Sequence, residues 1–127
     1  MTKQRFLREG DELTDDTMIV IRGGLLEEML LRSDALRNFE VYGTFGISVF
    51  AIKDSTVDAV AAEARFGRFE RLTLIRAGEL RARGLRIEPT GQNVRHYDVG
   101  FDVLDDGIAA LMGCDCEIIE NQYHVPD

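Results

Sequence analysis

Short apolar runs, separated by polar and glycine-containing segments, recur along the chain and give the first indication of its fold. Each run has the length of a strand and is rich in β-branched and aromatic side chains, a pattern typical of β-sheets. The expected strands cover residues 17–21, 47–52, 69–75, 85–90 and 95–103, and the tail holds a further candidate at 117–119.

The segment RHYDVGFDV, residues 95–103, alternates most regularly between apolar and polar side chains. Because successive side chains of a strand point to opposite faces, one side is expected to face the core and the other solvent or a site. Tyr97, Val99, Phe101 and Val103 are predicted to be buried, and His96, Asp98 and Asp102 to be markedly more exposed.

Between these runs, hydrophobic positions return every three to four residues, which indicates helices. Helices are expected at 25–38, 54–67, 76–84 and 104–113. In the first helix a stripe is expected to face the core; it consists of Leu25, Leu26, Met29 and Leu36. The sequence therefore predicts an α/β (α+β) domain, a mixed sheet of about five strands with two to four helices packed on it.

The 127 residues are enough for one domain with a real core and too few for two. Residues 1–16 are predicted to form a polar N-terminal arm, and residues 17–127 a single globular domain. The arm is too polar for the apolar region of a signal peptide, and no apolar run is long enough to span a membrane. We therefore expect a cytoplasmic protein without a membrane partner.

The net charge is −8, from 23 acidic and 15 basic residues. This balance argues against nucleic acid as the main ligand, because such binding depends on neutralising phosphates. Seven arginines fall between residues 65 and 86, and they are expected to solvate exposed faces or to form one basic strip. An acidic protein of this kind suits a protein partner. Charge would then set the rate of encounter between the two proteins and the specificity of their binding.

The two cysteines, Cys114 and Cys116, are separated by a single residue. A disulfide between them would be awkward in ordinary backbone geometry. With His124 they lack the doubled spacing of zinc sites, so no metal is expected. They are interpreted as small, buried or half-buried side chains.

In the stretch MIVIRGG, Arg22 follows an apolar run and precedes the glycines Gly23 and Gly24. A guanidinium at the end of a strand could grip a phosphate or carboxylate, while Gly23 would let the backbone approach the ligand. The alternative is an arginine on an open surface, or one paired with Glu27 or Glu28. Under the first hypothesis, Ser48 or His96 supplies a second polar contact.

No strong catalytic motif accompanies Arg22. The dinucleotide-binding and P-loop glycine patterns are absent, and the serine in GISVF is not in a nucleophile elbow. His96 and Asp98 stand two residues apart on one face of an expected strand, close enough to share a pocket. A solvated polar face is the alternative interpretation of this pair.

The stretches VIRGG, YGTFGISVFA and GLRIEPT followed by RHYDV resemble small, functionally unassigned bacterial proteins of actinobacterial type. More distantly, the chain is similar to the ADP-ribosyltransferase superfamily. That resemblance implies that Arg22 grips NAD, that Ser48 stands on the following strand, and that a late glutamate such as Glu88, Glu117 or Glu120 acts on the ribose. The chain has one serine rather than a Ser-Thr-Ser run, and no clear glutamate motif follows.

Two functions are therefore predicted. The first is a small cytoplasmic protein-interaction module of the kind found in toxin–antitoxin, phage or defence systems, with no cofactor. The alternative is an ADP-ribosyltransferase-like enzyme that uses NAD, with Arg22 and Gly23 at the nucleotide and Ser48, His96 and Glu88 as the candidate catalytic residues.

Overall fold

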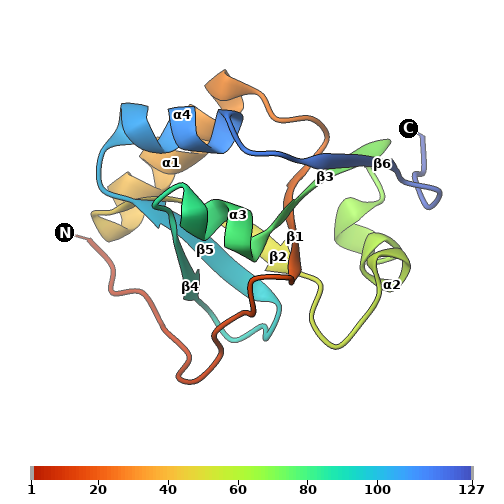
Figure 1. The fold of residues 1–127 in the computed structure, drawn as a ribbon, viewed down its shortest axis with the longest axis horizontal. Coiled ribbons are helices and arrows are strands. Elements are labelled where there is room, and N and C mark those ends of the chain that lie inside the picture. The colour runs from red at the N-terminus through yellow and green to blue at the C-terminus, as the bar shows by residue number, and fades with distance from the viewer. Residues whose placement is uncertain (1, 127) are drawn as a thin grey trace.

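The computed structural model describes residues 2–126 and folds them around one β-sheet (Figure 1). The sheet has the order β4-β5-β2-β1-β3-β6, and every neighbouring pair is antiparallel. The strands are β1 (Met18–Gly23), β2 (Phe45–Ala51), β3 (Arg71–Arg76), β4 (Arg86–Pro89), β5 (His96–Phe101) and β6 (Glu117–Glu120). The helices are α1 (Glu28–Tyr42), α2 (Val57–Ala61), α3 (Ala77–Ala82) and α4 (Leu104–Met112), with a 3-10 turn at Ala64–Phe66.

The predicted fold class, a single α/β domain with helices packed on a sheet, is confirmed. The sheet has six strands rather than about five because the candidate segment in the tail pairs with β3 as β6. All strand pairs of the sheet are antiparallel. The alternation of strands and helices along the chain therefore does not lead to parallel pairing of the strands in this fold. Met1 and Asp127, the outer ends of the two expected regions, lie outside the described residues.

Local capping explains where α1 ends and where α2 begins. Helix α1 continues past Asn38 to Tyr42 and ends at Gly43, whose φ of 79° is the left-handed conformation that glycine adopts readily. The Asn38 side chain instead donates a hydrogen bond to the carbonyl of Thr44, 3.0 Å away. Helix α2 begins where the Thr56 side chain accepts a hydrogen bond from the Ala59 amide, as the capping pattern predicts.

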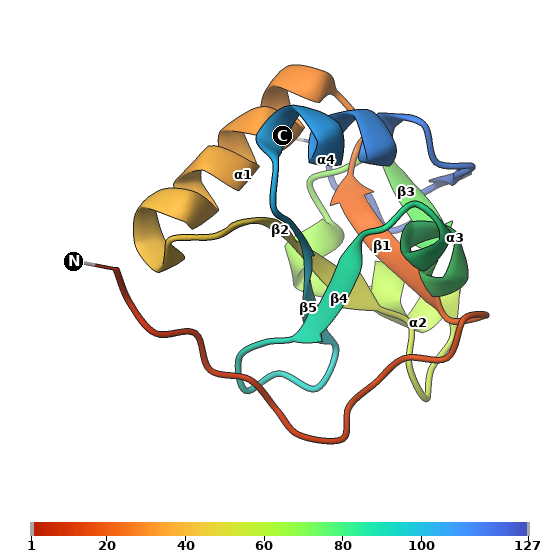
Figure 2. The same ribbon diagram turned by 60° about the vertical axis from the view of Figure 1, so that its left-hand side comes forward.

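One face of the sheet carries the larger of two hydrophobic clusters, which we call the large core. It lies beneath α1, α3 and α4, and the two views show these helices together over that face (Figures 1 and 2). Leu31 of α1, Leu80 of α3 and Ile108 of α4 are almost completely buried there against strand side chains. Full burial of such side chains is worth roughly 1.5–3 kcal/mol each, so this face supplies most of the stability.

The opposite face carries the small core, formed where α2 and the 3-10 turn pack on β1 and β3. Its buried members are Val20, Val60, Ala61, Phe66, Leu72 and Leu74. No residue of β4 or β5 belongs to this cluster. The polar half of this face, on β2, β5 and β4, is therefore available for other contacts.

The alternation predicted for β5 is correct at three of its four apolar positions. Tyr97 and Val99 are completely buried and Phe101 nearly so, but Val103 is 55% exposed. The strand ends at Phe101, and Val103 precedes α4 outside the alternating part of the chain. Asp98 was expected to be exposed and is instead only 3% exposed, because other side chains cover it.

The predicted apolar stripe is wrong except at Leu26, which lies just before α1 and packs against the large core. The buried side chains of this helix are Leu31 and Ala35, whereas Met29 is 84% exposed and Leu36 is also exposed. Leucines occur on several sides of this helix, so the spacing of apolar residues fits more than one face. The choice between these faces was made by packing against β2 and α4.

Residues 2–16, which we call the arm, run in an extended path past the β4–β5 end of the sheet (Figure 2). Leu7 forms an isolated antiparallel bridge with Thr90. Arg8 donates hydrogen bonds to the carbonyls of Thr90, Gly91, Val94 and His96. Leu13 joins the large core. The arm is thus pinned at Arg8 and Leu13.

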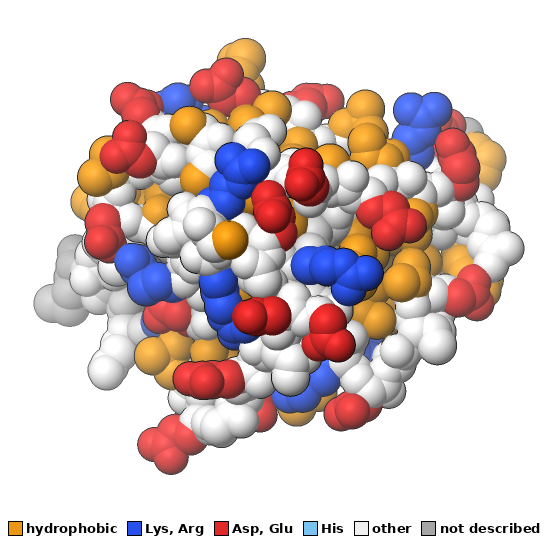
Figure 3. Space-filling model, in the orientation of Figure 1, with side chains coloured by type: hydrophobic (Ala, Val, Ile, Leu, Met, Phe, Trp, Pro, Cys, Tyr) orange, Lys and Arg blue, Asp and Glu red, His pale blue; other side chains and the backbone are white. Residues whose placement is uncertain are grey.

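The surface mixes the two signs of charge. On the face seen in Figure 3, acidic and basic side chains are interspersed. Within residues 2–126, no helix is both long and apolar enough to cross a membrane.

Candidate ligand-binding site

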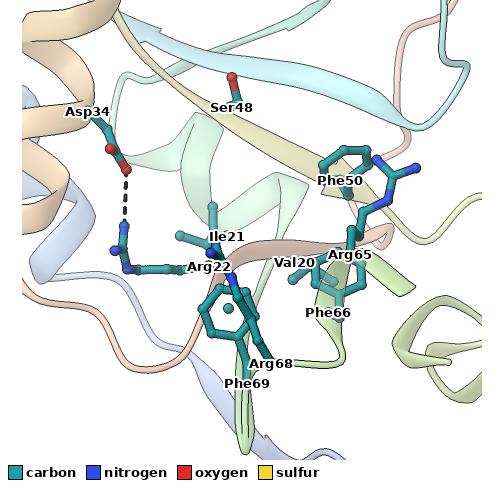
Figure 4. Close-up of a pocket in the computed structure, with 11 residues that line it drawn as sticks. Val20, Ile21, Arg22, Asp34, Ser48, Phe50, Arg65, Phe66, Arg68 and Phe69 are labelled. Atoms are coloured by element: carbon teal, nitrogen blue, oxygen red, sulfur yellow. Dashed lines mark hydrogen bonds and ion pairs between the residues drawn. The ribbon is translucent and has the colours of Figure 1, made fainter. Parts of the chain in front are cut away.

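A pocket of about 310 Å³ opens where β1 ends, between α1 and the 3-10 turn (Figure 4). Its lining combines three arginines and three phenylalanines with Ser48 and Asp34. The arginines are Arg22, Arg65 and Arg68, and the phenylalanines are Phe50, Phe66 and Phe69. We call it the Arg22 pocket.

The end of β1 has an irregular backbone that shapes this pocket. The register between β1 and β3 shifts between Val20 and Arg22, and such irregularities re-aim side chains. At Gly23 the ring of Phe69 occupies the space that a β-carbon would need. Gly23 therefore allows Phe69 to form a wall of the pocket. This is a contact with a side chain of the protein itself, whereas the sequence predicted an approach of the backbone to a ligand.

Arg22 lies inside this hollow and not on an open surface. Its Nη1 is 3.0 Å from Oδ2 of Asp34 in α1, and its side chain is 21% exposed (Figure 4). The expected acidic neighbours, Glu27 and Glu28, are not its partners. Asp34 lies farther along α1, on the side of that helix that faces the pocket. The lining of the pocket therefore holds one carboxylate and three guanidinium groups, so the pocket is basic within an acidic protein.

Arg65 and Arg68 were not recognised as site residues from the sequence, where they belong to the basic strip. The guanidinium of Arg65 lies 4.2 Å from the centre of the Phe50 ring, and that of Arg68 lies 4.8 Å from the centre of the Phe69 ring. Such stacking holds a guanidinium in place and leaves N–H groups that can bind an anion. In Arg65 the Nε atom already lies 3.5 Å from Oε1 of Glu63, so only its remaining N–H groups are left for a ligand. The repeated Arg-Phe pairs in ARFGRFE were the available signal.

Ser48 stands on β2 at the rim of the Arg22 pocket, as an exposed side chain. Its hydroxyl donates a hydrogen bond to Oδ1 of Asp98, directly opposite on β5, over 3.2 Å. Ser48 also lines two neighbouring cavities, of about 300 and 340 Å³. The hydroxyl thus lies where the Arg22 pocket and these two cavities adjoin.

Arg22, Gly23 and Ser48 are brought together, whereas His96 and Glu88 do not line the Arg22 pocket. His96 Nδ1 lies 2.9 Å from Thr90 Oγ1, and the imidazole packs edge-on against Phe50. Glu88 lies on β4, across β5 from Ser48, and forms an ion pair with Arg86 at 3.7 Å. Glu117 and Glu120 are on β6, at the other edge of the sheet.

Metal ligation is not indicated by the side chains of residues 2–126, which contain no group of three or more His, Cys, Asp or Glu that could hold an ion. Cys114 and Cys116 are both free; Cys114 is buried and Cys116 exposed. Burial raises the pKa of the Cys114 thiol to about 11.

Comparison with known proteins gives no family assignment: no family model matches the chain, and no curated protein or solved structure is significantly similar to it. Chemically, the site offers guanidinium forks for an anion, phenyl rings for a flat apolar group, and one hydroxyl. It is therefore better equipped for recognition of a ligand than for acid–base chemistry on it.

Proposed function

We propose that this protein binds a small phosphate-bearing ligand with a flat ring, of the nucleotide class, in the Arg22 pocket. The observation that carries the proposal is the convergence of three arginines and three phenylalanines on one hollow that holds a single carboxylate. Arginine forks match phosphate oxygens geometrically, and aromatic side chains provide faces for a base.

The contact between Arg22 and Asp34 supports this function. Asp34 is partly exposed, with 42% of its side chain accessible, so it can return to solvent when a ligand phosphate takes its place. Arg22 would exchange one anion for another, and its guanidinium would already be oriented before binding. A group held in its bound geometry loses less entropy on association.

The size of the pocket bears on which nucleotide fits. The pocket volume of about 310 Å³ lies at the lower end of the range of volumes of ligand-binding sites. A volume of this size suits a mononucleotide. NAD, the ligand implied by the resemblance to ADP-ribosyltransferases, would have to extend past Ser48 into the adjoining cavity that also contains Asp34 and Ser48. Glu88 lies outside the pocket, so we propose binding, with NAD as one ligand to test, and no transfer reaction.

A calorimetric titration tests the proposal. AMP, ADP, NAD and inorganic phosphate are titrated into the wild-type protein and into Arg22→Lys, which keeps the charge but loses the fork. Binding of at least one nucleotide should weaken about tenfold or more in the variant, the effect of losing one charge-assisted hydrogen bond. Arg86→Lys, an exposed arginine outside the pocket, is the matched control and should bind as the wild type does. Equal affinity in both variants, or no nucleotide binding to the wild type, contradicts the proposal.

The outer side of α1 favours a second candidate function, a cytoplasmic protein-interaction module of a toxin–antitoxin, phage or defence system. The side chains of Leu25, Met29, Leu30, Leu36 and Phe39 are all exposed on or just before this helix. Met29 and Leu36 line one surface hollow, and exposed apolar groups that lie together often mark interfaces. Co-purification with the product of a neighbouring gene should be lost in Met29→Glu and retained in Met112→Glu, an exposed methionine on α4. Retention in both variants excludes this surface.

A further inference from the structure

Three cavities adjoin across the polar half of the sheet face, and Ser48 lines all of them. The Arg22 pocket, of about 310 Å³, shares Asp34 with a middle cavity of about 300 Å³. The middle cavity in turn shares Asn38 and Tyr42 with a third cavity of about 340 Å³, which the arm helps to line. The three cavities therefore form one continuous depression, which we call the trough.

Basic side chains outnumber carboxylates along the trough, although the protein as a whole is acidic. The carboxylates that line it among the described residues are Asp34 and Asp98. Each already pairs with an arginine of the lining, Asp34 with Arg22 over 3.0 Å and Asp98 with Arg5 over 3.3 Å. The other basic side chains of the lining are Lys3, Arg37, Arg65 and Arg68. The trough is thus locally positive and attracts anions despite the net charge of −8.

Three of these cations lack an acidic partner. Among residues 2–126, the Lys and Arg side chains with no described carboxylate within 4.0 Å are Lys3, Arg37, Arg68 and Arg76. Arg68 lines the Arg22 pocket, Arg37 the middle cavity and Lys3 the third cavity. Arg76 lies elsewhere, at the end of β3. Each cavity of the trough therefore has one unpaired cation, and successive phosphates of a chain can bind to them.

Aromatic rings stacked with guanidinium groups accompany these cations. In the Arg22 pocket, Phe50 and Phe69 each carry one such group. Tyr42, which lines both the middle and the third cavity, lies 4.7 Å from the guanidinium of Arg5. Phe6 adds a ring that is 59% exposed to the third cavity. Bases of a single strand stack on aromatic rings and guanidinium planes, whereas bases of a duplex are covered by their neighbours.

We infer that the trough binds a single-stranded oligonucleotide of about three nucleotides, one for each cavity. Lys3, Arg37 and Arg68 bind its phosphates, and the rings and guanidinium planes hold its bases. The inference rests on the proposed function, because one nucleotide of the chain occupies the Arg22 pocket. It extends that function from a free nucleotide to a nucleotide chain. An acidic peptide would satisfy the cations but would leave the rings without flat partners.

Titration calorimetry compares AMP with two adenine trinucleotides, one of RNA and one of DNA. At least one trinucleotide should bind the wild-type protein at least about tenfold more tightly than AMP, because linked nucleotides bind at a high effective concentration. The ratio of the two trinucleotide affinities identifies the preferred sugar. An adenine strand of about twelve nucleotides should bind at least about tenfold more tightly than the duplex that it forms with its complement, since only the strand offers its bases for stacking.

Substitutions outside the Arg22 pocket separate the trough from the pocket. Lys3→Ala and Arg37→Ala should each weaken trinucleotide binding about threefold or more and make it less dependent on salt. Both side chains are exposed and neither lines the Arg22 pocket, so folding and AMP binding should not change. Arg22→Lys should weaken the binding of both ligands. Arg76→Ala removes the unpaired cation that lies outside the trough, and this matched control should bind both ligands as the wild type does.

The possible results distinguish the trough from the proposed function. Equal affinities for AMP and both trinucleotides overturn the inference and leave the proposed function intact. Trinucleotide binding that Lys3→Ala and Arg37→Ala do not weaken also overturns it, as does duplex binding as tight as that of the single strand. Trinucleotide binding that depends on Lys3 and Arg37 but not on Arg22, without binding of AMP, contradicts the nucleotide site in the Arg22 pocket and supports the rest of the trough. Absence of binding by any of these ligands contradicts both proposals.

Discussion

On one side of the sheet three helices bury a continuous apolar layer, and on the other a short helix and a 3-10 turn form a small cluster centred on β1 and β3, with Phe50 of β2 and Ile119 of β6 packed against it. Both sides belong to the same strands, so each strand contributes to two very different environments. The polar half of the second side, which the N-terminal arm partly covers, is where Ser48 and Asp98 meet, and the Arg22 pocket opens beside it.

This difference separates stability from recognition. Side chains beneath α1, α3 and α4 have no polar groups that must reach a ligand, so they can be packed for stability alone. On the other side, incomplete cover leaves room for the arginines of the Arg22 pocket and for the arm. Substitutions on the two sides should therefore affect different measurements, and four experiments test this expectation.

The largest effect is expected in the large core. Phe101→Ala should lower the free energy of unfolding by about 3–5 kcal/mol, because the nearly buried ring leaves a cavity when it is removed. Val103→Ala, two residues later and exposed, is the control and should change it by less than about 0.5 kcal/mol. Urea denaturation measures both. An unchanged midpoint in Phe101→Ala would mean that this face is not the main source of stability.

Gly23→Ala should have a smaller effect on stability and a direct one on the pocket. The new methyl group would occupy the position of the Phe69 ring, so the ring must move, at a cost of about 1–3 kcal/mol. NMR spectra should show the change around Phe69, and nucleotide affinity should fall with it. Gly84→Ala, with open space around the added methyl group, reports the strain of a left-handed glycine without any clash. Unchanged signals from Phe69 would show that this wall is looser than the structure indicates.

Arg22→Lys should hardly affect folding while it weakens ligand binding. The pair with Asp34 is partly exposed, so its loss should change the free energy of unfolding by less than about 1 kcal/mol. Nucleotide affinity in the wild type should also fall as salt increases, since screening weakens attraction between exposed charges. Thermal denaturation and a titration at several salt concentrations measure the two effects. A large loss of stability would assign Arg22 a structural role.

The smallest effect concerns the two cysteines. Cys114 belongs to the large core, and burial raises its thiol pKa to about 11, so it stays protonated and protected from pH 7 to 9. Iodoacetamide should therefore label the exposed Cys116 first, with almost no change in stability. Labelling of Cys114 should increase only as the pH approaches 11 or when the protein unfolds. Mass spectrometry distinguishes the two sites, and equal labelling at pH 8 contradicts the assignment.

Much of the fold was predictable from local pattern. The alternation in β5 and the apolar runs of the other strands indicated the sheet, since period-two burial is a property of the strand itself. Thr56 similarly marked the start of a helix through its own hydrogen bond, whereas the first helix was expected to end at residue 38 and ends at Gly43. The same local reasoning singled out Arg22 beside Gly23 at the end of a strand, and both line the pocket.

Other features depended on contacts between segments far apart in the chain. Asp98 was predicted to be exposed, and it is buried because Arg5 and Ser48, 93 and 50 residues away along the sequence, close over it. The partner of Arg22 is Asp34 and not the nearer glutamates, because the rotation of α1 against β2 decides which acid faces the pocket. That rotation also left Met29 outside the core. The sequence thus determined which segments form strands and helices, since hydrogen bonding and periodicity act locally. Only the tertiary structure decided which charges meet, because such pairing depends on how these segments pack.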